Sequence, residues 1–222
     1  MLQASTLKFL RDLKKHNNRE WFEANRKTYE AAKTDFESFV GAVLEKMSKT
    51  DDALAHLTAK DCTFRINRDV RFSKDKSPYK NNMAMYISHG GKKVMNAGYY
   101  FHCEPGAAFL GGGVWMPMAP ELKKIRQEID YSWDEFKKLL QNKKFKTAFA
   151  DLERTAEVLL TRPPKGYEEN NPAIEYLKLK SFIASAKISD EDILGKDLVK
   201  KIVTHFETMK PFIDFLNRAL EH

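Results

Sequence analysis

The chain has 222 residues, of which 42% are hydrophobic, 12% aromatic and 31% charged. This balance is typical of a globular protein in water and excludes disordered and collagen-like chains. No apolar run approaches the ~20 residues that cross a bilayer, and no secretion signal opens the sequence, so we expect a cytoplasmic protein with no membrane partner. Two cysteines, Cys62 and Cys103, fit a reducing compartment and are too few for a disulfide framework or a zinc site.

The positive charge is concentrated in one stretch of the chain. Of the net charge of +7, residues 60–93 carry +6, because this stretch holds nine lysines and arginines but only three aspartates. A basic excess confined to one stretch favours an anionic partner, such as a phosphorylated small molecule, a nucleic acid or an acidic protein. The alternative is a solvated face that keeps the protein in solution.

Helical periodicity dominates the first fifty residues. Leucines recur every third residue over 7–13 and predict a short helix with Ser5 as its N-cap. From Asn18, which is also a natural N-cap, apolar residues follow a 3.6-residue period as far as residue 48. This second helix would have about thirty residues, which is long for a globular protein, and Thr34 is the expected place for a break.

The period changes in the middle of the chain and becomes helical again afterwards. Strands are predicted over residues 64–72, 83–89, 97–104, 107–114 and 181–188. Gly-Gly and Pro-Gly pairs connect some of them over hairpin lengths, so the sheet is expected to be antiparallel. Helices are predicted again over residues 122–156, 173–178 and 192–219.

Strands that are segregated from helices indicate an α+β fold. We expect an antiparallel sheet of about five strands, flanked in sequence by N-terminal and C-terminal helices that pack mainly on one face. No long linker divides the sequence, so a single domain is predicted over residues 1–219. Leu220-Glu221-His222 is similar to the start of an expression tag and is interpreted as a tag remnant.

The densest group of polar residues lies in and after the first predicted strand, over residues 64–80. Side chains alternate along a strand, so Arg65, Asp69 and Arg71 point to one face. Two guanidinium groups beside one carboxylate suit a phosphate or carboxylate held by paired hydrogen bonds, while Asp69 orients an arginine or exchanges a proton. Arg68 falls on the opposite, apolar face, where it must find a carboxylate or leave through a bulge.

Further candidates come from the following loop and from another strand. Lys76 and Tyr79 lie close enough in sequence to reach the same bound anion. His102 and Glu104 share one side of a later strand, and they become candidate acid–base groups if that side faces Asp69. The alternatives are a structural Arg–Asp lattice and ordinary polar residues on an exposed face. The predicted anion-binding residues are therefore Arg65, Arg68, Arg71, Lys76 and Tyr79, and the predicted catalytic residues are Asp69, His102 and Glu104.

The spacing of this group resembles a known motif. The pattern Arg65-x-x-Arg68-Asp69-x-Arg71-Phe72-x-x-x-Lys76-x-x-Tyr79, with Asp75 before the lysine, is similar to the defining motif of a bacterial family known as domain of unknown function 2461. The resemblance extends over nearly the whole chain, through residues 17–22, 111–117, 122–126 and 165–167. It implies no assigned reaction, ligand or partner, but it favours a functional site over a purely structural lattice.

Other motifs of cofactor and metal binding are missing from the sequence. Gly111-Gly112-Gly113 is not followed by the Lys-Ser/Thr pair of a phosphate-binding loop, so close backbone packing is the better interpretation. The histidines lack the spacing of a metal site, and no dinucleotide-binding or nucleophile-elbow motif is present. We therefore predict neither a metal nor a cofactor.

Three functions fit these residues. The first is an anion pocket for a phosphorylated or carboxylated small molecule, in an enzyme or a sensor. The second is a nucleic-acid-binding module, in which bases stack on Tyr79, Tyr99, Tyr100 and Phe101. The third is a structural or protein-interaction domain with a buried Arg–Asp network, which Asp69→Asn would destabilise. The first is favoured because acidic residues are interleaved with the basic ones, whereas a groove that follows a nucleic-acid backbone is more uniformly positive.

Overall fold

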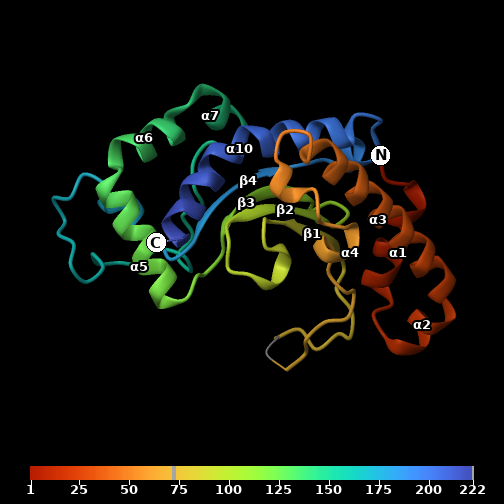
Figure 1. Cartoon of the computed structure of the whole chain (residues 1–222). Coiled ribbons are helices and arrows are strands. Elements are labelled where there is room, and N and C mark those ends of the chain that lie inside the picture. Colours follow the sequence, from red (N-terminus) through yellow and green to blue (C-terminus); the bar gives the residue numbers. More distant parts are fainter. Residues whose placement is uncertain (72–73, 222) are drawn as a thin grey trace. The chain divides into compact units, whose positions relative to one another are not determined.

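The computed structural model describes residues 1–71 and 74–221 (Figure 1). Its helices are α1 (Ala4–Lys15), α2 (Arg19–Ala24), α3 (Arg26–Met47), α4 (Ala59–Cys62), α5 (Ala119–Tyr131), α6 (Trp133–Gln141), α7 (Lys143–Phe149), α8 (Ile174–Leu177), α9 (Asp190–Leu194) and α10 (Leu198–Glu221). The strands are β1 (Met83–Ile87), β2 (Gly98–Cys103), β3 (Phe109–Val114) and β4 (Phe182–Lys187), and single 3-10 turns lie at Asp52–Leu54 and Gly91–Lys93.

The predicted α+β fold is confirmed. The four strands form one antiparallel sheet in the order β1-β2-β3-β4, in the middle of the chain, and helices precede and follow it in sequence. The described residues thus give four strands rather than about five, because the described part of the segment predicted as a strand over 64–72 forms only one isolated bridge, Asn67↔Tyr79. Phe72 and Ser73, within and next to that segment, lie outside the described residues.

The chain divides into two compact units. Unit 1 comprises Met1–Ile87, Tyr100–Leu110 and Lys187–Thr204, and unit 2 comprises Ser88–Tyr99, Gly111–Ala186 and His205–His222. Strands β2, β3 and β4 contribute residues to both. Each unit is assembled from separate stretches of sequence, and the expectation of one domain over residues 1–219 stays a prediction. Of the proposed tag remnant at residues 220–222, His222 lies outside the described residues.

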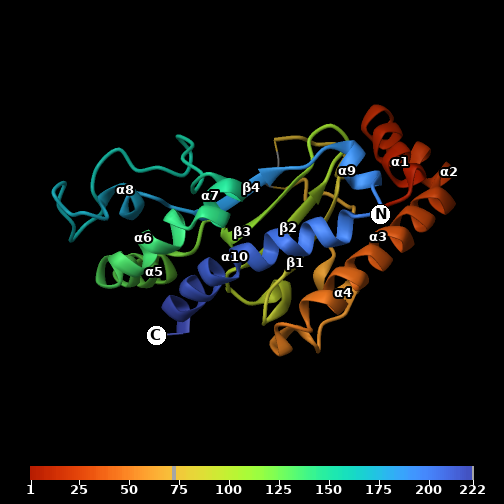
Figure 2. The same cartoon turned by 90° about the horizontal axis from the view of Figure 1, so that it is seen from above.

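In unit 1, an aromatic contact between α3 and β2 organises the core. Phe36 and Phe39 of α3 lie 6.4 Å and 5.5 Å from the ring of Phe101, which is fully buried. Helix α1 lies alongside α3 (Figure 2) and buries the leucines that recur every third residue. Burying such side chains removes apolar surface from water at about 25 cal/mol per Å2, which holds these helices against the strands.

In unit 2, the glycines at the end of β3 allow close packing. At Gly113, φ is 127°, and a Cβ would collide with the carbonyl oxygen of Phe182 on β4. A Cβ at Gly112 would lie 2.5 Å from the sulfur of Met209 on α10. On neighbouring β2, the ring of Tyr99 packs against Phe206 of α10 in a tilted arrangement, with 5.0 Å between ring centres. The interpretation of the glycine run as a place of close backbone packing is confirmed.

The N-terminal helices differ from the prediction at their ends. Asn18 caps α2 as expected, because its side chain accepts a hydrogen bond from the backbone N–H of Trp21. The break in the long helix falls at Asn25 rather than near Thr34. The side chain of Asn25 bonds back to the carbonyl of Trp21, which competes with continuation of the helix. Helix α1 begins after Gln3, so Ser5 is not its N-cap.

The described residues include no helix with both the length and the apolar character that a membrane span requires.

Candidate functional site

The described residues 64–71 and 74–80, here called the loop segment, belong to unit 1 and extend away from the strands (Figure 1). Its two arms are joined by the bridge Asn67↔Tyr79 and by backbone hydrogen bonds from Arg68 to Pro78 and from Lys80 to Ile66. A regular strand does not form, because Asp69 and Asp75 accept hydrogen bonds from backbone N–H groups two residues later, which turns the chain.

Arg68 fastens the two arms of the loop segment to each other. Its Nη2 donates to the carbonyl of Tyr79 at 3.1 Å and pairs with Asp75 at 3.0 Å, and its side chain is 20% exposed. The expectation that an arginine at this position must find a carboxylate is confirmed. Because Nη2 is engaged within the segment, Arg68 serves to hold the loop together.

Asp69 and Arg71 form an exposed pair. Arg71 donates from Nε and Nη2 to the two carboxylate oxygens of Asp69 at 3.0 Å and 2.7 Å. The side chain of Arg71 is 74% exposed and that of Asp69 is 40% exposed. The side-chain and backbone hydrogen bonds from Arg71 lower the pKa of Asp69 to about 2. The Arg–Asp network is therefore not buried at this point, in contrast to the third hypothesis.

Lys76 and Tyr79 also make contacts within unit 1. The Nζ of Lys76 donates to the carbonyl of Val70 at 2.8 Å. Tyr79 is 5% exposed, and its ring stacks on Phe22 of α2 with 3.9 Å between centres. The side chain of Asn17 accepts from the N–H of Tyr79 at 3.1 Å and donates to its carbonyl at 3.0 Å. These contacts attach the loop segment to the connection between α1 and α2.

Arg65 and Lys80 carry the positive charge that remains uncompensated. Arg65 is exposed, and it has no ion pair with any residue in the described ranges. Lys80 donates to the carbonyl of Arg65 at 3.0 Å, and its Nζ lies 5.5 Å from the centre of the Phe64 ring. Burial, followed by the charges of Arg65 and Arg68, lowers the pKa of Lys80. An anion bound here would relieve this repulsion.

A second group of polar residues lies along strand β2 and directly after it, also in unit 1. Tyr100, His102 and Glu104, here called the β2 face, are joined by hydrogen bonds between Tyr100 Oη and His102 Nδ1 (3.0 Å) and between His102 Nε2 and Glu104 Oε2 (3.2 Å). Lys14 of α1 donates to the other oxygen of Glu104 at 2.9 Å. The imidazole stacks on Phe109 of β3 with 4.8 Å between ring centres, which fixes its plane.

The protonation states along the β2 face follow from its environment. Burial alone would raise the pKa of Glu104, but hydrogen bonds and charge from Lys14 and His102 outweigh it and lower the pKa. Burial raises the pKa of Tyr100 to about 12. Glu104 is thus a carboxylate that can accept a hydrogen bond from Nε2 of His102. In the neutral imidazole with its proton on Nε2, Nδ1 accepts the hydroxyl proton of Tyr100. The arrangement has the order of a hydroxyl, a base and a carboxylate that orients the base.

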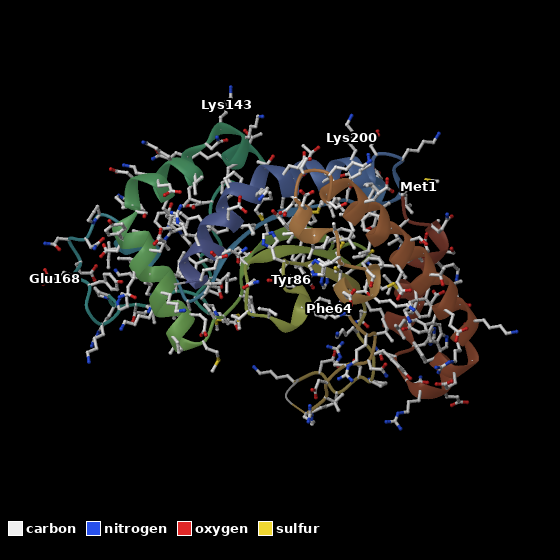
Figure 3. All side chains as sticks on the ribbon, viewed as in Figure 1. Met1, Phe64, Tyr86, Lys143, Glu168 and Lys200 are labelled. Carbon is white, nitrogen blue, oxygen red and sulfur yellow. The ribbon has the colours of Figure 1, made fainter. Side chains whose placement is uncertain are left out.

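The structure connects the two groups through Phe64 rather than through Asp69. The ring of Phe64, where the loop segment leaves the strands (Figure 3), lies 6.5 Å from the ring of Tyr100. No described hydrogen bond or ion pair joins His102 or Glu104 to Asp69. Phe64 of the loop segment therefore adjoins the β2 face, and Lys80 lies against the ring of Phe64.

Two residues that hold these groups in place were not identified from the sequence. Lys14 meets Glu104 across 90 positions, and no local pattern indicates such a contact. Asn17 meets Tyr79 across 62 positions. For Asn17 a signal existed, because it lies in a polar break between helices and in the stretch 17–22 that shares the family resemblance.

Burial limits the other roles considered for this region. Of the four aromatic residues proposed to stack on bases, Tyr79, Tyr99 and Phe101 are buried, and Tyr100 is partly exposed. Cys62 and Cys103 are buried, and burial raises the pKa of the Cys103 thiol to about 12. Among residues whose positions are described, no three His, Cys, Asp or Glu side chains are grouped as a metal site requires.

Comparison with known proteins gives a family. No curated protein and no solved structure shows a significant match to the chain. A family model described as a conserved hypothetical protein, DUF2461, matches residues 5–215, which include the loop segment, the β2 face and most of α10. The resemblance noted in the sequence is thereby confirmed, and the chain belongs to the DUF2461 family.

Proposed function

We propose that this protein is an enzyme that binds a small molecule with a carboxylate or phosphate group and moves a proton on it. The observation that carries the proposal is the hydrogen-bonded series Tyr100–His102–Glu104, which Lys14 completes, with Lys80 close by on the ring of Phe64. A hydroxyl bonded to a base, with the base bonded to an orienting carboxylate, is the geometry that proton-transfer chemistry requires.

The proton transfer can be followed atom by atom. Tyr100 Oη accepts a proton from the substrate while its own proton passes to Nδ1 of His102. The imidazolium that forms is stabilised by the carboxylate of Glu104, and the reverse sequence returns a proton to the product. Because burial keeps Tyr100 neutral before the substrate binds, the tyrosine relays a proton and holds no resident charge.

The anionic group of the substrate is assigned to Arg65 and Lys80. Phe64 contacts Tyr100, and Lys80 contacts both Phe64 and the backbone carbonyl of Arg65, so Lys80 lies near the relay and Arg65 follows Phe64 in the chain. Arg65 offers a planar set of donors that suits a carboxylate or phosphate. In this assignment, Arg68, Lys76 and Tyr79 shape the loop segment around Arg65 and do not touch the ligand.

Thermal denaturation at low salt tests the anion site. The wild type is screened against nucleotides, sugar phosphates, carboxylic acids and short oligonucleotides, together with Arg65→Ala and a control, Arg26→Ala, on an exposed helix surface. A ligand at 100 times its Kd raises Tm by roughly 5 to 10 °C. We expect a small anion to do so in the wild type and in the control but not in Arg65→Ala. Stabilisation by oligonucleotides alone, with a steep salt dependence, would instead support nucleic-acid binding.

Deuterium exchange tests the proton relay. Once an anion is found, its carbon-bound hydrogens are followed by NMR in D2O with the wild type and with His102→Asn. We expect exchange to slow by about 100-fold or more in the variant, because a positioned base is removed, while binding of the anion persists. Equal exchange rates in the two proteins would rule out His102 as the base.

A structural role for part of the motif is favoured by a separate observation. Arg68 joins the two arms of the loop segment, and Asn17 holds Tyr79 against α2. Arg68→Ala is therefore expected to lower the stability of the protein, and the binding that remains in the folded fraction is expected to keep its affinity. Arg65→Ala is instead expected to keep the stability of the wild type and to lose affinity for the anion.

A further inference from the structure

A cavity in unit 2 has a chemistry that the proposed function does not use. It has a volume of about 290 Å3 and lies among α6, α7 and α8. Helix α6 contributes side chains at spacings of four and three residues, which places them on one helix face. The lining of the cavity includes Trp133, Lys137, Leu140, Lys146, Asp151 and Tyr176.

One wall of the cavity is aromatic. The rings of Trp133 and Tyr176 lie 5.7 Å apart at 46°, and Leu140 is a buried apolar contact beside them. Tyr176 is held in place by the edge of Phe136 at 5.5 Å and by the guanidinium of Arg154, which lies 4.6 Å from its ring centre. A fixed aromatic wall of this kind accepts a planar ring at small cost in side-chain entropy.

The polar groups of the cavity leave a positive balance. Asp151 already accepts the hydroxyl of Tyr176 at 3.2 Å and lies 3.8 Å from Arg154, so its charge is compensated. Lys137 and Lys146 are exposed and form no ion pair with the part of the chain that the structure describes. Two ammonium groups beside an aromatic wall favour a ligand with negative charge.

The backbone that carries Asp151 is strained. Ala150 has φ 62° and ψ −71°, and the N–H of Asp151 bonds to the carbonyl of Phe149 at 2.8 Å, so Ala150 is the centre of a three-residue turn that is rare for a residue with a Cβ. This turn ends α7, and the carboxylate of the next residue meets the hydroxyl of Tyr176. Such strain persists where the surrounding structure holds it, and it occurs often at binding sites.

We propose that this cavity binds a small molecule that combines a planar ring with a carboxylate or a phosphate. The ring lies against Trp133 and Tyr176, and the acidic group is held by Lys137 and Lys146. The volume is at the lower end of the range for ligand pockets and fits one or two fused rings. The site shares no residue with the anion site of unit 1, so either proposal can fail without the other.

Titration with four probes tests the proposal. The probes are 2-naphthoate, 1-naphthyl phosphate, 2-naphthol, which lacks the acid, and acetate, which lacks the ring. Calorimetry is carried out with the wild type, with the double variant Lys137→Gln/Lys146→Gln, and with Lys143→Gln, a control on α7 outside the cavity lining (Figure 3). We expect one or both of the ring-bearing acids to saturate, and the double variant to bind them about tenfold more weakly, because charge-assisted hydrogen bonds are lost.

The site would be overturned by no saturable binding of either ring-bearing acid, by equal affinity in the wild type and the double variant, or by binding of 2-naphthol or acetate as tight as that of the ring-bearing acids. An equal loss in Lys143→Gln would likewise show that general charge, and not the cavity, holds the probe. Binding that is weakened in the double variant and kept in Arg65→Ala assigns the probe to this cavity, whereas binding that is weakened only in Arg65→Ala assigns it to the anion site of unit 1 and overturns the present site. Whether the carboxylate or the phosphate binds more tightly identifies the acid class.

Discussion

In the loop segment, charged side chains find partners a few residues away. Asp69 pairs with Arg71, and Arg68 pairs with Asp75. On the β2 face, in contrast, Glu104 is joined to Lys14 across 90 positions, and the hydrogen bonds continue through His102 to Tyr100. Asp69 is 40% exposed and Glu104 is 19% exposed, so water screens the first pair far more than the second.

This difference separates two uses of the same residue types. Exposed pairs between near neighbours contribute little to stability, because water competes for both partners. Partly buried groups that are linked in series hold each other in one protonation state and one orientation, which is what a catalytic group needs. The richest polar motif in the sequence therefore mostly shapes a loop, while the less conspicuous alternation on β2 provides the chemistry of the proposed function.

The largest effect is expected at the anchor of the loop segment. Asn17→Ala removes both hydrogen bonds to the backbone of Tyr79 and one to Asn81, and it leaves the N–H of Tyr79 without an acceptor. We expect a loss of about 2 to 3 kcal/mol in the free energy of unfolding, measured by urea denaturation. Asn67→Ala, on an exposed residue of the opposite arm, is the control and is expected to change little. Equal losses in the two variants would show that Asn17 is not a specific anchor.

An intermediate effect is expected on the β2 face. Glu104→Gln and Lys14→Met each remove one end of the pair between α1 and β2. Each variant removes one charge and leaves the opposite charge without its partner. We therefore expect each to lose about 1 kcal/mol in the free energy of unfolding, and the double-mutant cycle to show a coupling energy of about that size. Additive losses would contradict the contact.

The pH dependence of the stability lost in Glu104→Gln gives a second measurement on the β2 face. The pKa of Glu104 is lower in the folded chain than its ordinary value of 4.5, so the carboxylate stabilises the fold fully above that value. The stability difference between the wild type and Glu104→Gln is therefore expected to be constant near neutral pH and to shrink as the pH falls through the folded pKa. Urea denaturation between pH 7 and pH 3 checks this, and a difference that grows toward acid would have the wrong sign.

The smallest effect is expected for the exposed pair. The pKa of Asp69 is about 2 because Arg71 donates to both of its oxygens, and NMR titration of the carboxyl carbon should find it there. Even so, Asp69→Asn is expected to leave Tm unchanged within error, because solvent screens the pair. A large drop in Tm would restore the hypothesis of a structural Arg–Asp network, and the comparison between the two regions would fail.

Much of the fold was predictable because it depends on local pattern. The alternation of side chains along a strand predicted that Tyr100, His102 and Glu104 share one side, and the structure joins them by hydrogen bonds. A charged side chain on an apolar face needs an opposite charge, which predicted a carboxylate partner for Arg68. The strand predicted over 64–72 failed because a strand requires a paired neighbour, and turns formed by Asp69 and Asp75 compete with that pairing.

The sequence by itself thus determined the α+β class, most helices and strands, and the residue types available for binding an anion. These features follow from side-chain periodicity and from the conformational preferences of single residues, which act over a few positions. Only the tertiary structure decided that Lys14 meets Glu104, that Asn17 holds Tyr79, and that Phe64 lies against Tyr100. Such contacts join distant positions because burying apolar side chains brings their backbones together, and no local pattern records which polar groups then become neighbours.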